Sequence, residues 1–390
     1  MIQNPLFIVL ILLFIEIAVL FLASRNQFKK YFQFLPSVFW IYFLPMLIST
    51  LGIIDAKSPI YQVISNYFLP TSLLLLLIPI DIKSILRLGK EALLTFFIGS
   101  LGMMVGTITV FTLFKQRLGD DFWAGFACLS ASWTGGSANM IAVKEALVTP
   151  DSIFLPMVVV DTIVPYVWMA ILVGVSSFQL FYDRWNQSEN KILQQWKQKG
   201  SSLSSSHRLK LKIVPTFFIL CIGFMGASFA KLAAGFLPMI KDVISPYAWT
   251  IILVSILGIL LSLTPLRKLG NYGASRIGYF ILYFVLTSIG AKANLSQLGS
   301  TFLLIMAGFL IVFIHAVILL LFSRIFKIPM FLVAVASQAN IGGVASAPVV
   351  AEIYQPGLAS VGLLLAILGN IVGTYFGIVS GQLMFFLTKI

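Results

Sequence analysis

The chain has 390 residues, of which 59% are hydrophobic and only 10% are charged. A mean hydropathy of +1.01 excludes an ordinary soluble globular protein. A spanning helix needs about 20 apolar residues, so the chain has room for about 10 to 13 crossings. The residue-by-residue alternation of a membrane β-barrel is not seen. The sequence therefore predicts an all-α, multi-pass protein of the cytoplasmic membrane.

The net charge of +13 does not indicate nucleic-acid binding. The basic residues lie mostly in short stretches beside apolar runs, as the loops on the cytoplasmic side of a membrane do. The first apolar run, Leu6 to Ser24, has no basic segment before it and is predicted to be a retained crossing rather than a signal peptide. The lipid bilayer is thus the expected partner, and nucleic acid is not.

Twelve apolar runs follow one another along the chain, and each predicts a helix. They fall near residues 6–24, 33–54, 59–80, 92–114, 121–146, 152–182, 213–231, 246–264, 272–290, 298–323, 329–352 and 357–388.

Two of these runs lose their apolar character near the middle. The first contains Ser132-Trp-Thr-Gly-Gly-Ser-Ala-Asn139, and the second contains Asn340-Ile-Gly-Gly-Val-Ala-Ser346. Backbone polar groups in hydrocarbon must be satisfied internally, so a glycine pair at membrane depth is tolerated only where it faces protein or water. We expect broken helices near 131–140 and 336–347. Paired interruptions of this kind point to the substrate site of a secondary transporter.

The two interruptions belong to two halves that resemble each other. Asp161-Thr-Ile-Val and Gly369-Asn-Ile-Val are about 208 residues apart. The sequence predicts an N-terminal repeat at 1–182, a basic cytoplasmic linker at 183–212 and a C-terminal repeat at 213–390. The loop of the first half that contains Lys83, Arg87 and Lys90 corresponds to residues 291–297 in the second half, where Lys292 is the only basic residue. Basic residues mark the cytoplasmic side of a membrane, so the two loops are predicted on opposite sides. This indicates inverted repeats. Six crossings in each half would instead make the repeats parallel, so the helix count and orientation stay open.

With these glycine-pair motifs the chain resembles the YjcL-like membrane family, domain of unknown function 819. That family is similar to the group of sodium/proton antiporters and bile-acid-type sodium symporters. The resemblance covers nearly the whole chain and implies two inverted structural repeats with two interrupted, crossing helices, divided into a core and a panel domain. It implies no substrate. In the second motif Val344 and Ser346 stand where the family pattern has proline and threonine.

The candidate site is built from the residues of the two interruptions and their neighbours. Free N–H groups at the start of a half-helix suit a carboxylate, and free carbonyls at the end of one suit Na⁺. The alternative is that small residues only let the helices pack closely. The candidate substrate- or ion-binding residues are Thr134, Gly135, Gly136, Ser137, Asn139, Asp161, Thr162, Gln338, Asn340, Gly342, Gly343, Ser346 and Asn370.

Asp161 is the sharpest single candidate, because a carboxylate inside an apolar helix is costly unless it pairs or faces water. It is the predicted Na⁺ or H⁺ site, and pairing with a lysine or capping of a neighbouring break is its alternative role. His315 is predicted to be a packed neutral imidazole bonded to a hydroxyl or carbonyl rather than a proton relay. Lys144 and Glu145, near a helix end, are expected to reach headgroups or to pair.

These observations predict a secondary transporter, coupled to Na⁺ or H⁺, for a small carboxylate-bearing solute such as an amino acid, short peptide or organic acid. The sequence carries none of the common enzyme motifs, and no cofactor is expected beyond Na⁺ as coupling ion. A homodimer is compatible with it. The alternatives are a cation/proton antiporter without an organic substrate and, from another class, a passive channel or membrane scaffold.

Overall fold

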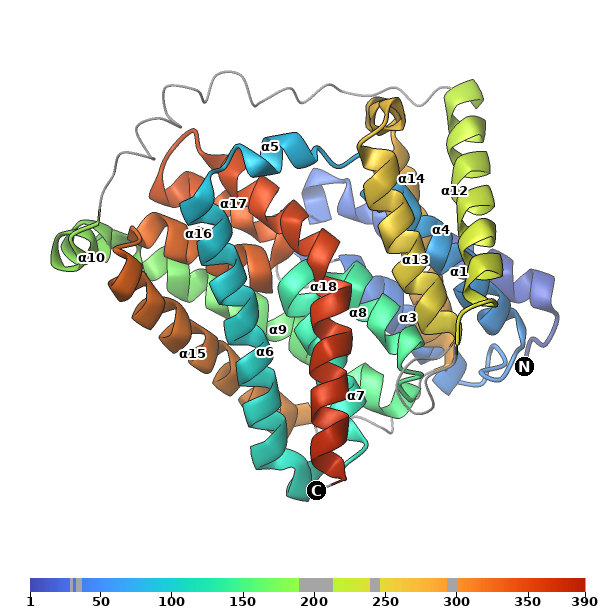
Figure 1. Ribbon diagram of the computed structural model, residues 1–390. Helices are drawn as coiled ribbons and strands as arrows, with labels where there is room; N and C mark the ends of the chain where they lie inside the picture. The colour runs from blue at the N-terminus through green and yellow to red at the C-terminus, as the bar shows by residue number, and fades with distance from the viewer. Residues whose placement is uncertain (29–30, 33–36, 189–212, 239–245, 293–300, 390) are drawn as a thin grey trace. The chain divides into compact units, whose positions relative to one another are not determined.

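The computed structural model describes residues 1–28, 31–32, 37–188, 213–238, 246–292 and 301–389. Helices make up nearly all of these residues, and no strand occurs among them (Figure 1). The chain forms two compact units, each assembled from three segments. Unit 1 contains residues 1–80, 144–162 and 209–302, and unit 2 contains residues 81–143, 163–208 and 303–390. Both units therefore draw on both halves of the chain.

Unit 1 is a bundle in which one helix, α14, packs against both α3 and α4, while α12 packs against α13 and α4. Helices α14 and α3 approach closely, because a Cβ on Gly290 would lie 2.2 Å from the carbonyl oxygen of Tyr42. The helices are α1 (Pro5–Ala23), α3 (Ser37–Thr50), α4 (Ile60–Leu77), α12 (Ile213–Ala234), α13 (Pro246–Ser262), the 3-10 helix η4 (Pro265–Tyr272), α14 (Ala274–Lys292) and the first half of α9 (Asp151–Gly174).

Unit 2 contains three long helices, α6, α15 and α18, and two pairs of short ones, α7 with α8 and α16 with α17. The long helix α18 packs against α7, α17, α16 and α6. Three of the short helices, α7, α16 and α17, are therefore packed against a long one. The elements are α5 (Ile82–Leu86), α6 (Lys90–Leu118), α7 (Phe122–Gly135), α8 (Ser137–Ala146), the 3-10 helix η2 (Val175–Phe178), α10 (Gln179–Asn186), α15 (Thr301–Phe326), α16 (Met330–Ile341), α17 (Gly343–Tyr354) and α18 (Ala359–Thr388).

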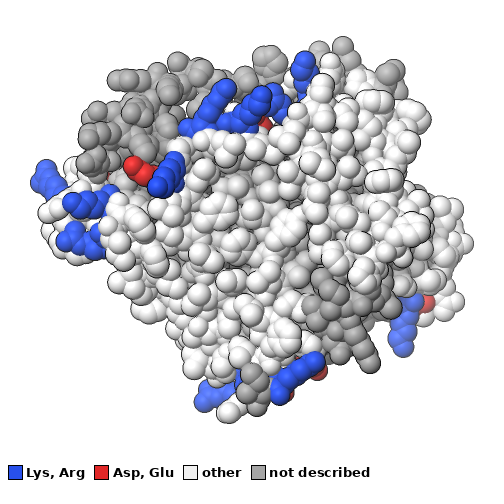
Figure 2. Space-filling view, viewed as in Figure 1, with Lys and Arg blue, Asp and Glu red and all other residues white. Residues whose placement is uncertain are grey.

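Among the described residues, eight helices are long and apolar enough to cross a membrane, or nine if the bent pair Tyr247–Ser262 and Pro265–Tyr272 forms one span. Large apolar side chains are exposed along them, for example Phe14 on α1 and Phe313 on α15, which suits contact with lipid. The face seen in Figure 2 consists mostly of uncharged residues, with lysines and arginines in separate groups. The protein is an all-α, multi-pass membrane protein, as the sequence predicts.

Three of the twelve expected helices are shorter or divided. The run 33–54 forms only the 14 residues of α3, and the runs 121–146 and 329–352 each form two short helices separated at a glycine pair. Residues 183–186 of the predicted linker belong to α10. Residues 189–212 of the linker lie outside the described residues.

The order of helices supports the predicted duplication. Helix α7 begins at Phe122 and α16 at Met330, and α9 begins at Asp151 and α18 at Ala359, a separation of 208 residues in both cases. Helices α1 and α12 repeat this separation. The inverted orientation of the two repeats stays a prediction.

Candidate functional site

The first interruption divides α7 from α8 at the glycine pair 135–136. Trp133 leaves helical geometry with φ −83° and ψ 16°, and Gly136 adopts φ 83° and ψ 175°. A positive φ of this kind is strained for residues with a Cβ, so glycine is the residue that the turn requires. The first N–H groups of α8 then lack intrahelical partners, as at any helix start.

The side chain of Asn139 closes this first interruption. Its Nδ2 donates to the carbonyl of Gly135 at 2.6 Å, across the break. Its Oδ1 accepts from the backbone N–H of Thr374 on α18 at 2.9 Å and from the Thr374 hydroxyl at 2.5 Å. The Oγ1 of Thr134 is buried and has no hydrogen-bond partner in the described structure. The indole Nε1 of Trp133, one residue earlier, is also buried and without a partner among the described residues, so two side-chain polar atoms at the end of α7 are left unsatisfied.

The second interruption lies between α16 and α17 at Gly342 and Gly343. Gly343 has φ 60°, again a conformation that favours glycine. Gln338 bridges this break, because its Nε2 donates to the Ser346 hydroxyl at 2.7 Å. The Oε1 of Gln338 is buried and, like Thr134 Oγ1, has no partner among the described residues. Each interruption thus leaves one buried oxygen unpaired, although nearly all buried polar atoms in proteins have a partner.

Asn340 attaches α16 to α6. Its Nδ2 donates to the carbonyls of Ala336 at 2.9 Å and Phe96 at 3.3 Å, and its Oδ1 accepts from the Ser100 hydroxyl at 2.7 Å. A Cβ on Gly99 would lie 2.7 Å from Asn340 Nδ2, so α6 needs a glycine at this contact. Asn340 therefore holds α16 to α6, and its role in ligand binding stays a prediction.

A chain of three hydrogen bonds lies beside Asn340 and joins α6, α15, α16 and α9. Nδ1 of His315 is 2.9 Å from the Gly99 carbonyl, and Nε2 is 2.9 Å from the Ser337 hydroxyl. Trp168 Nε1 donates to the same hydroxyl at 2.9 Å. A carbonyl only accepts, so Nδ1 carries the proton and Nε2 accepts from Ser337. This arrangement satisfies a neutral imidazole, which is the predicted role of His315.

Eleven of the thirteen predicted site residues belong to unit 2. Ser137, Gly136, Gly342 and Asn370 are partly exposed. Thr134, Asn139, Gln338, Asn340 and Ser346 are buried. Asp161 and Thr162 belong to unit 1, where both are partly exposed and the Thr162 hydroxyl donates to the Val158 carbonyl at 2.8 Å.

Sequence reasoning missed the partners of the asparagines and of the histidine. Ser100 and Thr374 are each one of several hydroxyl residues in the long apolar helices α6 and α18, and Ser337 lies in the short helix α16. Hydroxyl residues are common in membrane helices and form no motif here. Only the position of Thr374, four residues after Asn370, offered a signal, because residues four apart share one face of a helix.

Comparison with known proteins is in keeping with this architecture. The chain is 24% identical over 350 residues to a protein of Bacillus subtilis (strain 168) described as uncharacterized membrane protein YjcL, covering 85% of this chain and 86% of that protein. The model of the family described as protein of unknown function DUF819 matches residues 11–387. Since the match extends over almost the whole chain, both interrupted helices included, the protein belongs to the DUF819 family.

Proposed function

We propose that the protein is a secondary transporter that moves a small carboxylate-bearing solute, such as an amino acid, short peptide or organic acid, together with Na⁺ or H⁺. The observation that carries this proposal is the pair of unpaired, buried oxygens, Thr134 Oγ1 and Gln338 Oε1, one at each interruption. An unsatisfied buried polar group costs about 1–3 kcal/mol. A bound ion or polar solute supplies the missing partner.

The backbone at the interruptions suits both the carboxylate of a solute and a cation. Helices α8 and α17 begin at Ser137 and Gly343 and present free N–H groups with the positive end of a helix dipole, which favours a carboxylate. Helices α7 and α16 end at Gly135 and Ile341, and carbonyls in the last turn of a helix lack intrahelical partners. The Gly135 carbonyl accepts from Asn139, and the remaining carbonyls of these last turns favour Na⁺. No charged residue lies within 134–139 or 338–346. Recognition at the interruptions would therefore rest on dipoles and neutral side chains.

The experiment is a thermal-unfolding screen of the purified protein against small carboxylates, with and without Na⁺ at constant ionic strength. A ligand that binds the folded state at 100 times its Kd stabilises it by about 2.7 kcal/mol. We expect one class of carboxylate to raise Tm, and to raise it further when Na⁺ is present. The proposal is refuted if no carboxylate and no cation changes Tm in a saturable manner and proteoliposomes accumulate none of them.

Two matched variants test whether the ligand that shifts Tm binds at the first interruption. Thr134→Val removes the unpaired hydroxyl at nearly constant shape, and we expect it to reduce the shift in Tm caused by the ion or the solute. Thr107→Val is the control, because the Thr107 hydroxyl on α6 is buried and already donates to the Met103 carbonyl at 2.7 Å. Equal ligand responses in the two variants would place the binding elsewhere.

Asp161→Asn distinguishes the proposed transporter from a cation/proton antiporter without an organic substrate. An antiporter that depends on this carboxylate should lose all exchange. A symporter should keep solute binding while losing the dependence on the coupling ion. Solute-induced shifts in Tm and ion flux into proteoliposomes, measured on the same preparation, separate the two outcomes.

A further inference from the structure

A polar cavity lies in unit 1, at the C-terminal end of α8. Its volume is about 420 Å³. Four helix ends surround it: α4 begins at Ile60, α9 begins at Asp151, α8 ends at Ala146 and α14 ends at Lys292. Because three of these helices are candidate spans, the cavity lies where spans meet the water boundary. The proposed site involves seven of its lining residues: Lys57, Ser58, Ser65, Lys144, Glu145, Asp151 and Lys292.

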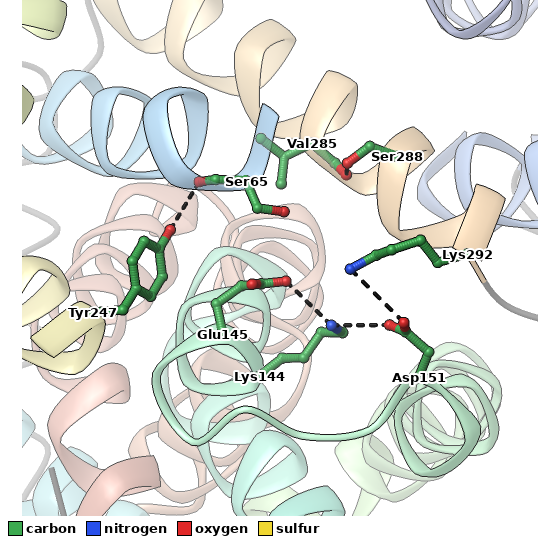
Figure 3. A network of polar contacts seen from close by, with 8 residues as sticks. All are labelled: Ser65, Lys144, Glu145, Asp151, Tyr247, Val285, Ser288 and Lys292. Atoms are coloured by element: carbon green, nitrogen blue, oxygen red, sulfur yellow. Dashed lines mark hydrogen bonds and ion pairs between the residues drawn. The ribbon is translucent and has the colours of Figure 1, made fainter. Parts of the chain in front are cut away.

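The carboxylates of this cavity are already paired (Figure 3). Nζ of Lys144 lies 3.1 Å from Glu145 Oε1 and 2.9 Å from Asp151 Oδ1. Nζ of Lys292 lies 3.7 Å from Asp151 Oδ2. The side chain of Lys144 is only 5% exposed, so it is a buried ion shared by two acids. Of the two roles expected for Lys144 and Glu145, pairing and headgroup contact, pairing is the one observed.

On average, each lysine of the cavity makes fewer of the described ion pairs than each carboxylate does. Three lysines line it against two carboxylates. Lys57 is exposed and makes no ion pair in the described part of the chain. Lys292 makes one long contact with an oxygen of Asp151, and its side chain is 25% exposed. The charge left uncompensated in this cavity is therefore positive.

Two serines supply independent evidence of a missing ligand. Ser58 and Ser65 line the cavity and are 5% and 2% exposed, and neither hydroxyl has a hydrogen-bond partner among the described residues. Tyr247 donates to the backbone carbonyl of Ser65 at 2.8 Å and so holds this turn of α4 in place (Figure 3). Serine hydroxyls donate readily to oxyanions, and hydrogen bonds to a charged acceptor are the stronger kind.

We propose that this cavity binds a small oxyanion, a phosphate or carboxylate group, between Lys57 and Lys292, with the hydroxyls of Ser58 and Ser65 as donors. The Lys144 ion pairs hold the turn between α8 and α9 in place and prevent its two carboxylates from repelling the anion. The group belongs either to a free anion or to an anionic lipid headgroup, which have the same chemistry and reach the boundary of the spans from water or from the bilayer.

The opposing interpretation is that the cluster is purely structural. Lys144 and Lys292 lie in the last turns of α8 and α14, and Asp151 lies in the first turn of α9, positions in which these charges offset the helix dipoles. This interpretation accounts for the ion pairs but not for the two buried hydroxyls without partners. The serines therefore discriminate between the two.

The experiment titrates inorganic phosphate, at constant ionic strength, into the full-length protein in detergent and follows Tm. We expect a saturable rise in Tm, and an apparent Kd about tenfold weaker in Ser65→Ala and in Lys292→Gln. Ser288→Ala is the matched control, because the Ser288 hydroxyl on α14 already donates to the Val285 carbonyl at 2.7 Å (Figure 3). Thr134→Val, at the first interruption, should leave the phosphate response unchanged, which separates this proposal from the proposed transport.

A parallel titration uses short-chain phosphatidylglycerol, with phosphatidylcholine of the same chain length as its control. A response to phosphatidylglycerol alone, lost in Ser65→Ala, supports the site and identifies the lipid headgroup as the source of the anion. A response to phosphate supports a free anion. The proposal is overturned if neither compound raises Tm, or if Ser65→Ala and Lys292→Gln both respond like Ser288→Ala.

Discussion

The contact between α18 and the first interruption is close enough that one methyl group should disrupt it. A Cβ on Gly369 would lie 2.2 Å from the carbonyl oxygen of Thr134 and 3.4 Å from the Cα of Gly135. Both neighbours are backbone atoms, so no side-chain rotation relieves the clash. In Gly369→Ala the two helices must separate by about 1 Å to reach ordinary van der Waals distance. The interruption itself would then move.

The expected cost follows from two opposing effects. Overpacking a closely packed contact costs about 1–3 kcal/mol, and the rigid backbone here places Gly369→Ala near the upper value. Replacing a helical glycine by alanine gains about 1 kcal/mol from helix propensity. We expect a net loss of about 2 kcal/mol in the free energy of unfolding, measured by chemical denaturation of the purified protein in detergent and followed by far-ultraviolet circular dichroism.

Gly174→Ala is the matched control within the same unit. Gly174 ends α9 with helical φ and ψ, and a Cβ there would meet nothing within 4 Å. This variant should gain up to about 1 kcal/mol from propensity alone, so the two variants should differ by about 3 kcal/mol. Equal stability of Gly369→Ala and Gly174→Ala would refute the close packing of α18 on the interrupted helix.

Two further variants test the polar contacts within each unit. Lys144→Met leaves two carboxylates without their shared cation and should lower the free energy of unfolding by about 3 kcal/mol. Asp151→Asn in that background should recover part of the loss, and strictly additive effects in this double-mutant cycle would contradict the shared pairing. Asn340→Leu removes the bonds to α6 and should cost about 2 kcal/mol. The Ser100 hydroxyl keeps its own bond to the Phe96 carbonyl at 3.1 Å, so a loss above about 4 kcal/mol would indicate that α6 had also moved.

The interruptions were predictable from sequence because their cause is local. A glycine pair flanked by hydroxyl and amide residues stands out in a chain that is otherwise apolar, and glycine is needed wherever the backbone takes a positive φ, as Gly136 and Gly343 do. The duplication was visible for a similar reason, since it depends on spacing along the chain. Neither inference requires knowledge of which helices are neighbours.

The contacts of the interruptions were not predictable, because they depend on residues far along the chain. Asn139 is 235 residues from its partner Thr374, and Asn340 is 240 residues from Ser100. The environment of Lys144 is likewise set by packing. The sequence left pairing and headgroup contact open for this lysine, and the fold decides for pairing because it buries Lys144 between Glu145 and Asp151.

The side chain that bridges the interruption lies after the break in the first repeat and before the break in the second. The two repeats therefore share the interruption but not the contact that bridges it. In the first, the bridging amide is on the half-helix after the break, because Asn139 of α8 donates back to Gly135 of α7. In the second it is on the half-helix before the break, because Gln338 of α16 donates forward to Ser346 of α17. The first arrangement satisfies a backbone carbonyl at the broken end, and the second joins two side chains across the break. A different oxygen is left without a partner among the described residues, on Thr134 in the first case and on Gln338 in the second. Close packing alone would be served equally well by continuous helices with small residues. Two independent solutions that each retain an open helix end are instead what a pair of ligand-binding interruptions requires.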